Sequence, residues 1–345
     1  MFVSATGQDD NIGDSVLRRA HLDFLRSFGS LHVLVGANSQ DYISGLGLSA
    51  EDVQYSSPAG WRRSAAMSML RRRTALAFNC GEIRLDSAYL KTYLGHLPLV
   101  LLSRLHGGYS LHLGYGVRQS AYRWRRTIGM MLRLTRLSSW RDSSSARLMR
   151  VGSVTPDWAF STGQSAQQLD KGRLNSRNYL SLSMRGDRDF PPPNWFDSVL
   201  ALAQVLDLEI VVVPQVRRDN RHNRELSERL GARFVPWEME NHTVRETTVR
   251  ALYASSSVVV SDRLHALIIG ATEGAAPVGL TVGSPEKLHR TLAVVGLQDL
   301  CFAADSMDTA QLDRAVTLVR STPQYSAVAS ARAQLSTCAD EVGRL

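Results

Sequence analysis

The sequence contains few cysteines and almost no lysine. Its three cysteines, Cys80, Cys301 and Cys338, are isolated and form no CxxC pair, so neither a disulfide framework nor a metal site is indicated. Buried free thiols are expected instead. Of the 40 basic residues only three are lysine, an imbalance that coding bias explains as readily as a need for arginine chemistry.

Long apolar segments are also absent. The longest runs, such as 97–102 and 258–260 with the helix predicted after it, are far shorter than the roughly 20 residues that span a bilayer, so no transmembrane helix is predicted. The first residues, MFVSATGQDDNIGD, are polar and lack the basic and apolar regions of a secretory signal. We therefore expect a cytoplasmic protein. With 345 residues, of which 44% are hydrophobic, the chain is long enough for two domains.

The charge is basic, with a formal net value of +8, and it is unevenly distributed. The segment from Arg118 to Arg150 contains nine arginines and a single acid, Asp142, interleaved with tyrosine and tryptophan, and is expected to project positive potential. One interpretation is a solvated helix face. Another is peripheral contact with an anionic surface, either the inner face of the membrane or a lipid-diphosphate acceptor. Nucleic acid is not expected, because no helix-turn-helix, zinc-finger or RNP-like pattern accompanies the segment.

The two halves of the chain read as two α/β domains. In the first half, strands are predicted over 2–5, 31–35, 74–78, 98–103 and 111–115, with helices over 14–28 and 118–137 and a loop over 38–58. These segments predict a Rossmann-like domain of five or six strands over residues 1–165. A polar stretch over 160–178, rich in Ser, Gln and Gly, is the predicted linker.

The second half alternates regularly. Strands are predicted over 179–184, 209–213, 233–236, 257–260 and 277–282, and helices over 195–206, 221–230, 247–254, 264–274 and 285–295. Apolar strands separated by helices require a parallel sheet covered on both faces, which gives a second Rossmann-like domain over 175–320. Two such domains facing each other across a cleft predict a glycosyltransferase-B-like fold. Helices are predicted over 309–320 and 324–342. The segment 321–345 could pack back across the hinge between the two predicted domains.

The most informative polar motif is Ser261-Asp262-Arg263-Leu264-His265, where the strand over 257–260 meets the next helix. The end of a buried strand at a helix N-terminus is the usual anion site of an open α/β sheet. Ser261 or Asp262 is expected as the N-cap, Arg263 offers a planar fork of donors for phosphate or carboxylate, and imidazoles titrate near neutral pH. The alternative is a surface arginine beside a histidine satisfied within the fold.

Two further motifs follow predicted strands. In Asp10-Asn11-Ile12-Gly13-Asp14, Gly13 permits close backbone approach and Asp14 can cap the following helix, although a purely structural cap explains the motif equally well. Arg141 and Asp142 precede a serine run, where Asp142 can cap or orient Arg141. A structural ion pair fits that spacing as well.

Three blocks, taken together, resemble the polysaccharide pyruvyl transferase family. They are NIGDSVL, WRDSSSARLM followed by PDWAF, and SDRLHALIIGATEGAAPVGL with Lys287 downstream, in order over about 11–297. The resemblance implies transfer of the enolpyruvyl unit of phosphoenolpyruvate to a sugar of a cell-surface glycan or its precursor, forming a ketal. Family members resemble glycosyltransferase-B folds and need no cofactor. The acceptor is expected on the first domain, with a lipid-linked form considered, and phosphoenolpyruvate on the second.

The resemblance also implies roles for individual residues. The family's Arg-x-His element falls on Arg263 and His265, its Arg-Asp-x-x-Ser element on Arg141, Asp142 and Ser145. Arg185, at the end of the first strand of the second half, is a less specific match, and Gln215 and Asp219 are family-like. The family's glycine-rich segment corresponds to Asn79-Cys80-Gly81-Glu82, which has one glycine where several are usual.

These correspondences give a catalytic hypothesis. His265 is the candidate general acid that protonates C3 of phosphoenolpyruvate. Arg263 and Arg141 would clamp phosphate and carboxylate, and Arg185, Asn11, Gly13 and Asp14 complete the predicted substrate site. The alternative is that His265 only hydrogen-bonds phosphate while another group donates the proton. Two other functions stay open: a nucleotide-sugar glycosyltransferase of the same architecture, and a non-enzymatic assembly protein at a membrane surface.

Overall fold

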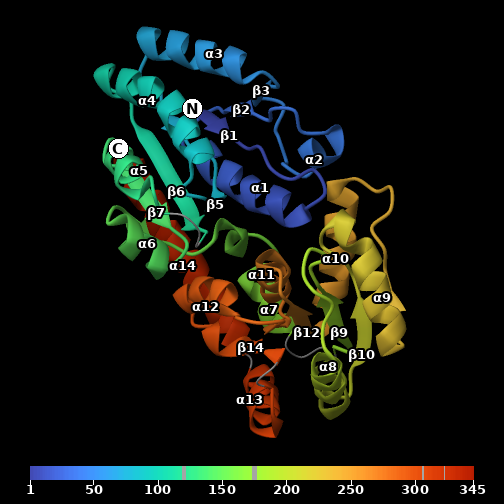
Figure 1. Ribbon diagram of the computed structural model, residues 1–345. Helices are drawn as coiled ribbons and strands as arrows, with labels where there is room; N and C mark the ends of the chain where they lie inside the picture. The colour runs from blue at the N-terminus through green and yellow to red at the C-terminus, as the bar shows by residue number, and fades with distance from the viewer. Residues whose placement is uncertain (119–121, 173–176, 305–306, 322) are drawn as a thin grey trace. The chain divides into compact units, whose positions relative to one another are not determined.

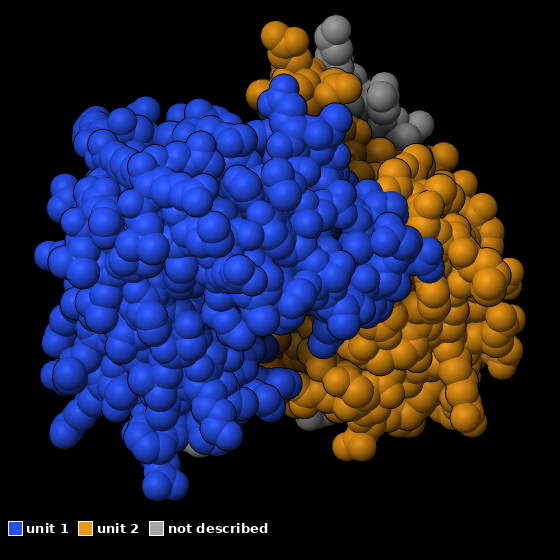
Figure 2. All heavy atoms as spheres, turned by 90° about the horizontal axis from the view of Figure 1, so that it is seen from above, with its two compact units in different colours: residues 1–9, 14–158, 334–345 blue, residues 10–13, 159–333 orange. Residues whose placement is uncertain are grey.

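The computed structural model describes residues 1–118, 122–172, 177–304, 307–321 and 323–345 (Figure 1). The chain folds as two compact units, coloured separately in Figure 2. Unit 1 contains residues 1–9, 14–158 and 334–345, and unit 2 contains residues 10–13 and 159–333. The predicted boundaries differ from these units. The short segment 10–13 and residues 159–165 belong to unit 2, and the last helix is divided, with its residues up to 333 in unit 2 and 334–345 in unit 1.

Unit 1 is built on a parallel sheet of eight strands in the order β3-β2-β1-β4-β6-β7-β8, with β5 paired to β6. The strands are β1 (Phe2–Ser4), β2 (His32–Leu34), β3 (Val53–Tyr55), β4 (Leu76–Ala77), β5 (Gly81–Ile83), β6 (Ser110–Val117), β7 (Leu137–Trp140) and β8 (Ser153–Val154). The helices are α1 (Ile12–Arg26), α2 (Gln40–Ser44), α3 (Pro58–Arg71), α4 (Ser87–Leu105), α5 (Arg125–Leu132) and α6 (Ser143–Met149), together with the end of α14 (Pro323–Gly343).

One apolar cluster joins α3, α4, α5 and α6 to the same face of this sheet. It includes Trp61 and Met69 of α3, Tyr93 of α4, Ile128 of α5 and Trp140 of β7, all of them buried. These helices therefore form a single layer whose other side faces outward.

Several predictions for this half were wrong. Residues 98–103 are not a strand but part of α4, which contains Pro98. Leu99 and Val100 are buried there while Leu101 is exposed, and a short apolar run alone does not separate a strand from a helix. The loop over 38–58 contains α2 and β3, and the helix over 118–137 is reduced to α5, with 119–121 outside the described residues. The sheet has more strands than the five or six predicted.

Unit 2 is built on a parallel sheet in the order β11-β10-β9-β12-β13-β14. Its strands are β9 (Tyr179–Ser183), β10 (Glu209–Val212), β11 (Arg233–Phe234), β12 (Ser256–Ser261), β13 (Ala276–Thr281) and β14 (Cys301–Ala303). The helices are α7 (Ala166–Gly172), α8 (Pro193–Leu206), α9 (Asn220–Leu230), α10 (His242–Ala254), α11 (Leu264–Thr272), α12 (Glu286–Leu292) and α13 (Thr309–Arg320).

The predicted alternation of strands and helices in this half is confirmed, although β14 was missed and α10 begins earlier than expected. The predicted linker over 160–178 is largely structured: Phe160 is fully buried, and the segment includes α7, with 173–176 outside the described residues. Over the described ranges, no helix is both long and apolar enough to cross a membrane.

Candidate functional site

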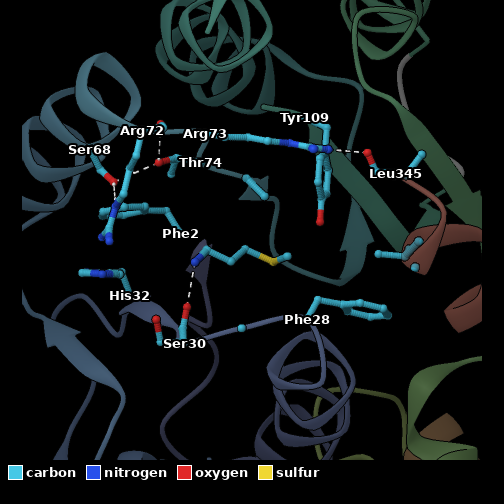
Figure 3. Close-up of a pocket in the computed structure, with 15 residues that line it drawn as sticks. Phe2, Phe28, Ser30, His32, Ser68, Arg72, Arg73, Thr74, Tyr109 and Leu345 are labelled. Carbon is cyan, nitrogen blue, oxygen red and sulfur yellow. Dashed lines mark hydrogen bonds between the residues drawn. The ribbon is translucent and has the colours of Figure 1, made fainter. Parts of the chain in front are cut away.

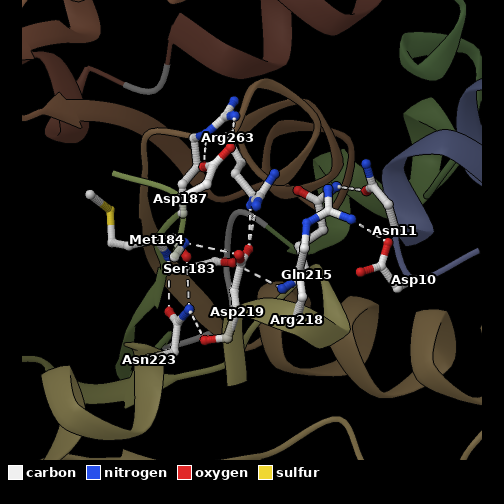
Figure 4. A network of polar contacts seen from close by, with 12 residues as sticks. Asp10, Asn11, Ser183, Met184, Asp187, Gln215, Arg218, Asp219, Asn223 and Arg263 are labelled. Atoms are coloured by element: carbon white, nitrogen blue, oxygen red, sulfur yellow. Dashed lines mark hydrogen bonds and ion pairs between the residues drawn. The ribbon is translucent and has the colours of Figure 1, made fainter. Parts of the chain in front are cut away.

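The candidate site lies in unit 2, at the carboxyl ends of three adjacent strands. In the sheet, β9 lies between β10 and β12, and Ser183 pairs with Ser261 at the end of the ladder. The strand order changes direction between β9 and β12, because β10 and β11 lie on one side of β9 while β12 to β14 lie on the other. Open α/β sheets bind ligands outside the strands at such a switch point. The segments that follow these three strands carry Asp187, Gln215, Arg218, Asp219 and Arg263, which Figure 4 shows together with Asp10 and Asn11 of the N-terminal segment.

A buried ion pair joins two of these loops. Arg263 follows β12, and its Nε and Nη2 each lie 2.5 Å from Asp219 Oδ2. The other carboxylate oxygen of Asp219 accepts the backbone N–H of Gly186, after β9, at 2.9 Å. Burial raises the pKa of Asp219, with the Arg263 guanidinium opposing it, and burial lowers the pKa of Arg263. The pair therefore fixes the Arg263 side chain at the switch point.

The start of α11 is held by a different residue than predicted. Ser261 Oγ accepts the backbone N–H of Arg263 at 2.9 Å and donates to the carbonyl of Ser183. Arg263 itself occupies the N-cap position, with extended backbone angles and no side-chain cap, so the expectation of Ser261 or Asp262 there was wrong. The alternative of a surface arginine was wrong, because Arg263 is 8% exposed and pairs with Asp219.

His265, in the first turn of α11, lies against the segment 10–13. A β-carbon added to Gly13 would lie 2.6 Å from His265 Cβ and 2.1 Å from Gln215 Nε2, so only glycine fits there. Gln215 Nε2 donates to Asn11 Oδ1 at 3.0 Å, and the same oxygen accepts the backbone N–H of Gly13 at 3.0 Å. An ion pair at 2.6 Å between Arg218 and Asp10 ties the segment down further. The structure thus brings together three residues that the sequence placed in the site: Asn11, Gly13 and His265.

Arg185, after β9, is the second arginine at the switch point. Its guanidinium binds Asp187 with two contacts, Nε to Oδ1 at 2.8 Å and Nη2 to Oδ2 at 2.7 Å. These hydrogen bonds raise the pKa of Arg185 and hold that of Asp187 well below its usual range. The backbone N–H of Arg185 donates to Asp262 Oδ1 at 2.9 Å, which connects the ends of β9 and β12.

Asp262 has an unusual pKa for a carboxyl group. Burial is the largest cause and raises it from 3.8 to about 6, against the opposing effects of the Arg185 N–H and the Arg263 guanidinium. A carboxyl that changes protonation near neutral pH is suited to proton transfer. The sequence predicted Asp262 only as a helix cap, because residue spacing does not show whether a side chain at the end of a strand is buried.

We expect Asp262 to make the stability of the protein pH-dependent. Its pKa is higher in the folded than in the unfolded chain, so the folded state binds the extra proton between about pH 4 and pH 6, and stability falls as pH rises through that window. In Asp262→Asn this dependence should disappear, with the unfolding free energies of variant and wild type diverging by about 3 kcal/mol between pH 4 and pH 7 in urea titrations. The exposed Asp197→Asn is the control; parallel profiles for Asp262→Asn and wild type would contradict the prediction.

The remaining predicted site residues lie in unit 1. Arg141, after β7, is 4% exposed and pairs with Asp157 at 3.0 Å, while Asp142 caps α6 by accepting the backbone N–H of Ser145 at 2.7 Å. Asp14 lies in the first turn of α1 and pairs with Arg18 at 3.2 Å. The helix begins at Ile12, so Asp14 is not its cap. A contact between phosphate and Arg141 or Asp14 stays a prediction.

A pocket of about 310 Å³ lies in unit 1 at the carboxyl ends of β1 and β4. This is the switch point of the first sheet. Arg18 Nε and Asn79 Nδ2 both donate to the carbonyl of Thr6 at 2.8 Å. The hydroxyl of Tyr89 donates to the carbonyl of Glu82 at 3.1 Å. The lining residues include both polar and aromatic side chains: Ser4, Thr6, Arg18, Phe78, Asn79, Cys80, Glu82, Ile83, Tyr89, Thr92, Tyr93, His96 and Tyr115. The segment that matched the family's glycine-rich element therefore borders a cavity.

A larger pocket, of about 420 Å³, lies at the opposite end of the same sheet (Figure 3). It is lined by the residues where β1, β2, β4 and β6 begin, and by both ends of the chain. Its polar groups bind one another: the Met1 ammonium donates to the Ser30 carbonyl at 2.7 Å, Arg72 Nε to Ser68 Oγ at 3.2 Å, and Arg73 to the Leu345 carbonyl. Because ligands bind at carboxyl ends of parallel strands, this pocket is the weaker candidate.

Two residues that support the site were not recognised in the sequence. Asn223 of α9 donates to the Met184 carbonyl at 2.7 Å and accepts its N–H at 2.9 Å, which fixes the backbone just before Arg185. Arg245 of α10 is fully buried and donates to the Pro214 carbonyl at 2.7 Å, directly before Gln215. Burial lowers the pKa of Arg245 to about 10. Over the described residues, no group of three or more His, Cys, Asp or Glu side chains is arranged to hold a metal ion.

The fold is shared with solved structures of low sequence identity. MurG from Acinetobacter baumannii is 12% identical, with a TM-score of 0.52 over 100% of this chain and 99% of that one. UDP-GlcNAc 2-epimerase from Neisseria meningitidis, bound to UDP-GlcNAc, is 12% identical, with a TM-score of 0.51 over 94% and 93%. A putative UDP-N-acetylglucosamine 2-epimerase from Listeria monocytogenes is 10% identical, with a TM-score of 0.52 over 94% and 90%. The similarity confirms the predicted class of two parallel-sheet α/β domains of glycosyltransferase-B type.

The sequence then narrows this class to one family. Residues 11–284 match the family model described as polysaccharide pyruvyl transferase. The chain belongs to this family, and it is therefore a transferase of polysaccharide modification. A search of curated proteins gave no match to the sequence.

Proposed function

We propose that this transferase uses phosphoenolpyruvate as donor and forms a pyruvate ketal on a sugar of a cell-surface glycan or its precursor. The observation that carries the proposal is the cluster at the switch point of unit 2. It combines Arg185, after β9, with Arg263, His265 and the Asp262 carboxyl of raised pKa at the N-terminus of α11. A donor with one phosphate and one carboxylate matches two guanidinium groups in charge, and Nη1 of each arginine lies outside the contact with its carboxylate.

Arg263 is the proposed phosphate clamp. Its ion pair with Asp219 orients the guanidinium while leaving Nη1 outside that contact. Arg185 is the proposed carboxylate ligand, with its partner Asp187 half exposed. Arginines fixed in advance by carboxylates lose little freedom when the donor binds, which favours a productive orientation.

The chemistry requires one proton at C3 of the donor. Protonation converts the methylene to a methyl group and leaves an oxocarbenium-like centre at C2, to which one sugar hydroxyl adds with loss of its proton. A second hydroxyl then displaces phosphate, and its proton leaves as the ketal closes. His265 is the proposed acid, with Gly13 placing the backbone against it. Asp262 is the alternative acid, because its pKa of about 6 keeps a protonated fraction near neutral pH.

The acceptor is assigned to unit 1, in the pocket beside Asn79. Tyr89, Tyr93 and Tyr115 provide aromatic surface there, and Asn79 and Glu82 provide polar groups. Such a lining suits a sugar ring, which has apolar C–H faces and a hydroxyl rim, and the volume is within the range of small-molecule sites. No cofactor is assigned to the reaction.

Arg263→Lys tests the clamp. Lysine keeps the charge but loses the planar fork, so we expect the affinity for phosphoenolpyruvate to fall by about tenfold or more, consistent with the loss of a charge-assisted hydrogen bond. Isothermal titration calorimetry measures the effect. Arg221→Lys, at an exposed position of α9, is the matched control. An unchanged dissociation constant for Arg263→Lys would contradict the role of Arg263.

The whole proposal is tested with substrates. The protein is incubated with phosphoenolpyruvate and a panel of glycan intermediates, and mass spectrometry detects the ketal as phosphate is released. Thermal shift with phosphoenolpyruvate and with nucleotide sugars separates this function from that of a glycosyltransferase, since two of the structurally similar proteins have UDP or UDP-GlcNAc in their descriptions. Stabilisation by nucleotide sugars alone would replace the proposal by that alternative.

A further inference from the structure

The outward side of the α3–α4–α5 layer in unit 1 carries no acidic residue. The chain has no Asp or Glu between Asp52 and Glu82, and none between Asp86 and Asp142, and these two intervals contain all three helices. Such long intervals without acid are unusual in a chain that has 32 acidic residues. The layer is one packed unit, because its inner side forms the apolar cluster described above.

Each of the three helices presents a stripe that mixes cationic and apolar side chains. In α4 the stripe consists of five exposed residues at helical spacing: Lys91, Leu94, Pro98, Leu101 and Leu105. Leu105 is 81% exposed, which is rare for a leucine in a folded chain.

The neighbouring helices repeat the pattern. In α3 the stripe is Arg63, Met67 and Leu70, and in α5 it is Arg126, Met130 and Arg133, all exposed. Helix α4 packs against both α3 and α5 (Figure 1), and the exposed stripes lie on the sides of these helices that face away from the apolar cluster. Over the described residues, none of the arginines in these stripes forms an ion pair with a carboxylate.

This surface differs from the basic segment that the sequence suggested. Arg141 belongs to that segment but is buried beside Asp157, so it cannot contribute to an outer surface. Glu341 of α14 lies beside Arg133 and Arg136 and marks one border of the surface. The basic segment 118–150 does not include α3 and α4, because the basic residues of these two helices lie earlier in the chain.

We propose that the outward side of the α3–α4–α5 layer binds the surface of an anionic phospholipid bilayer. Exposed Leu and Met side chains can enter the boundary between head groups and acyl chains, while the arginines and Lys91 contact lipid phosphates. Long basic side chains extend their charge to the head groups while their stems remain in the apolar layer. The proposal does not depend on which donor or acceptor the enzyme uses.

Two other occupants fit less well. A second copy of the chain would bring two acid-free cationic surfaces together, which is electrostatically unfavourable. A nucleic acid would satisfy the arginines but would leave the exposed leucines and methionines unaccounted for, since its phosphate backbone offers them no apolar partner.

The test is sedimentation with vesicles of phosphatidylcholine alone and of phosphatidylcholine mixed with phosphatidylglycerol. We expect the full chain to pellet with the anionic vesicles only, and to be released largely in 1 M NaCl, where the screening length is about 3 Å. Reversing two charges in Arg63→Glu/Arg126→Glu should lower the partition coefficient by at least about tenfold, since each basic residue near the surface contributes roughly fivefold. Leu101→Asp/Leu105→Asp should cause a comparable loss, because the apolar contribution is removed.

Matched controls lie on unit 2. Met239 is 90% exposed and Arg221 is exposed, so Met239→Asp and Arg221→Glu should bind vesicles as wild type does. Circular dichroism melting confirms that each variant is folded. The proposal is overturned by equal binding to neutral vesicles, by no binding to either kind, or by vesicle binding that the two double variants retain. Retention on duplex RNA without vesicle binding would identify a nucleic acid as the partner instead.

Discussion

Replacing His265 with alanine is expected to lower kcat for pyruvyl transfer by about 10²- to 10⁴-fold, the usual contribution of a general acid. The residue lies in the first turn of α11 beside Gly13, so the substitution removes the imidazole without affecting the Arg263–Asp219 pair. If His265 acts only on the transition state, KM for phosphoenolpyruvate should change little. Phosphate release, measured with the accepted sugar, gives both constants.

The histidine has a close control in the same unit. His289 of α12 is exposed, and His289→Ala should keep full activity. Asp262→Asn completes the set, because Asp262 is the other group that can supply the proton. Wild-type turnover in His265→Ala with a large loss in Asp262→Asn would transfer the acid role to Asp262.

The second large effect is expected on stability. Asp219→Ala leaves the Arg263 guanidinium buried without its carboxylate, and losing one partner of a buried ion pair costs about 3–5 kcal/mol of unfolding free energy. Urea denaturation measures the loss. Asp187→Ala breaks the other arginine–carboxylate pair of the site, but Asp187 is half exposed, so its loss should cost less than about 1 kcal/mol.

Comparing these two variants separates the effect of burial from the effect of losing a carboxylate. Both remove a carboxylate that binds an arginine at the same end of the sheet; the two pairs differ in burial, and Asp219 also accepts the Gly186 N–H. Equal losses in the two variants would contradict the importance assigned to burial. If Asp219→Ala is too unstable to purify, Asp219→Asn still provides an oxygen for Gly186 and should show a smaller loss.

The second half of the chain was predictable because its local patterns agree with its tertiary structure. Apolar strands such as β12 are buried on both faces, and they alternate with helices that begin and end near the expected residues. The first half was less predictable, because α4 has apolar side chains on both sides: Leu99 is buried and Leu101 is exposed. A helix that is apolar on two sides has no clear period, so residues 98–103 read as a strand.

The sequence predicted the motif at the site but not the residues that contact it. Arg263 and His265 follow a strand that the sequence marks clearly, and a strand end near a helix start is a local feature. The partners of Arg263 and His265 come from distant parts of the chain: Asp219 follows β10, and Gly13, in the first turn of α1, lies about 250 residues earlier. Such contacts depend on strand order in the sheet, which a single sequence does not specify. For the same reason, the raised pKa of Asp262 was not foreseen.

The placement of residues 10–13 in unit 2 has a consequence for dissecting the protein. A fragment over 159–333 would contain every strand of the second sheet but would lack Asn11 and Gly13, which cover Gln215 and His265. The backbone bridge between Asn11 and Val216 would be lost as well. No single cut separates the two units, because unit 2 contains 10–13 and unit 1 contains 334–345 in addition to its main segment. Neither unit can therefore be expressed whole as one uninterrupted stretch of sequence.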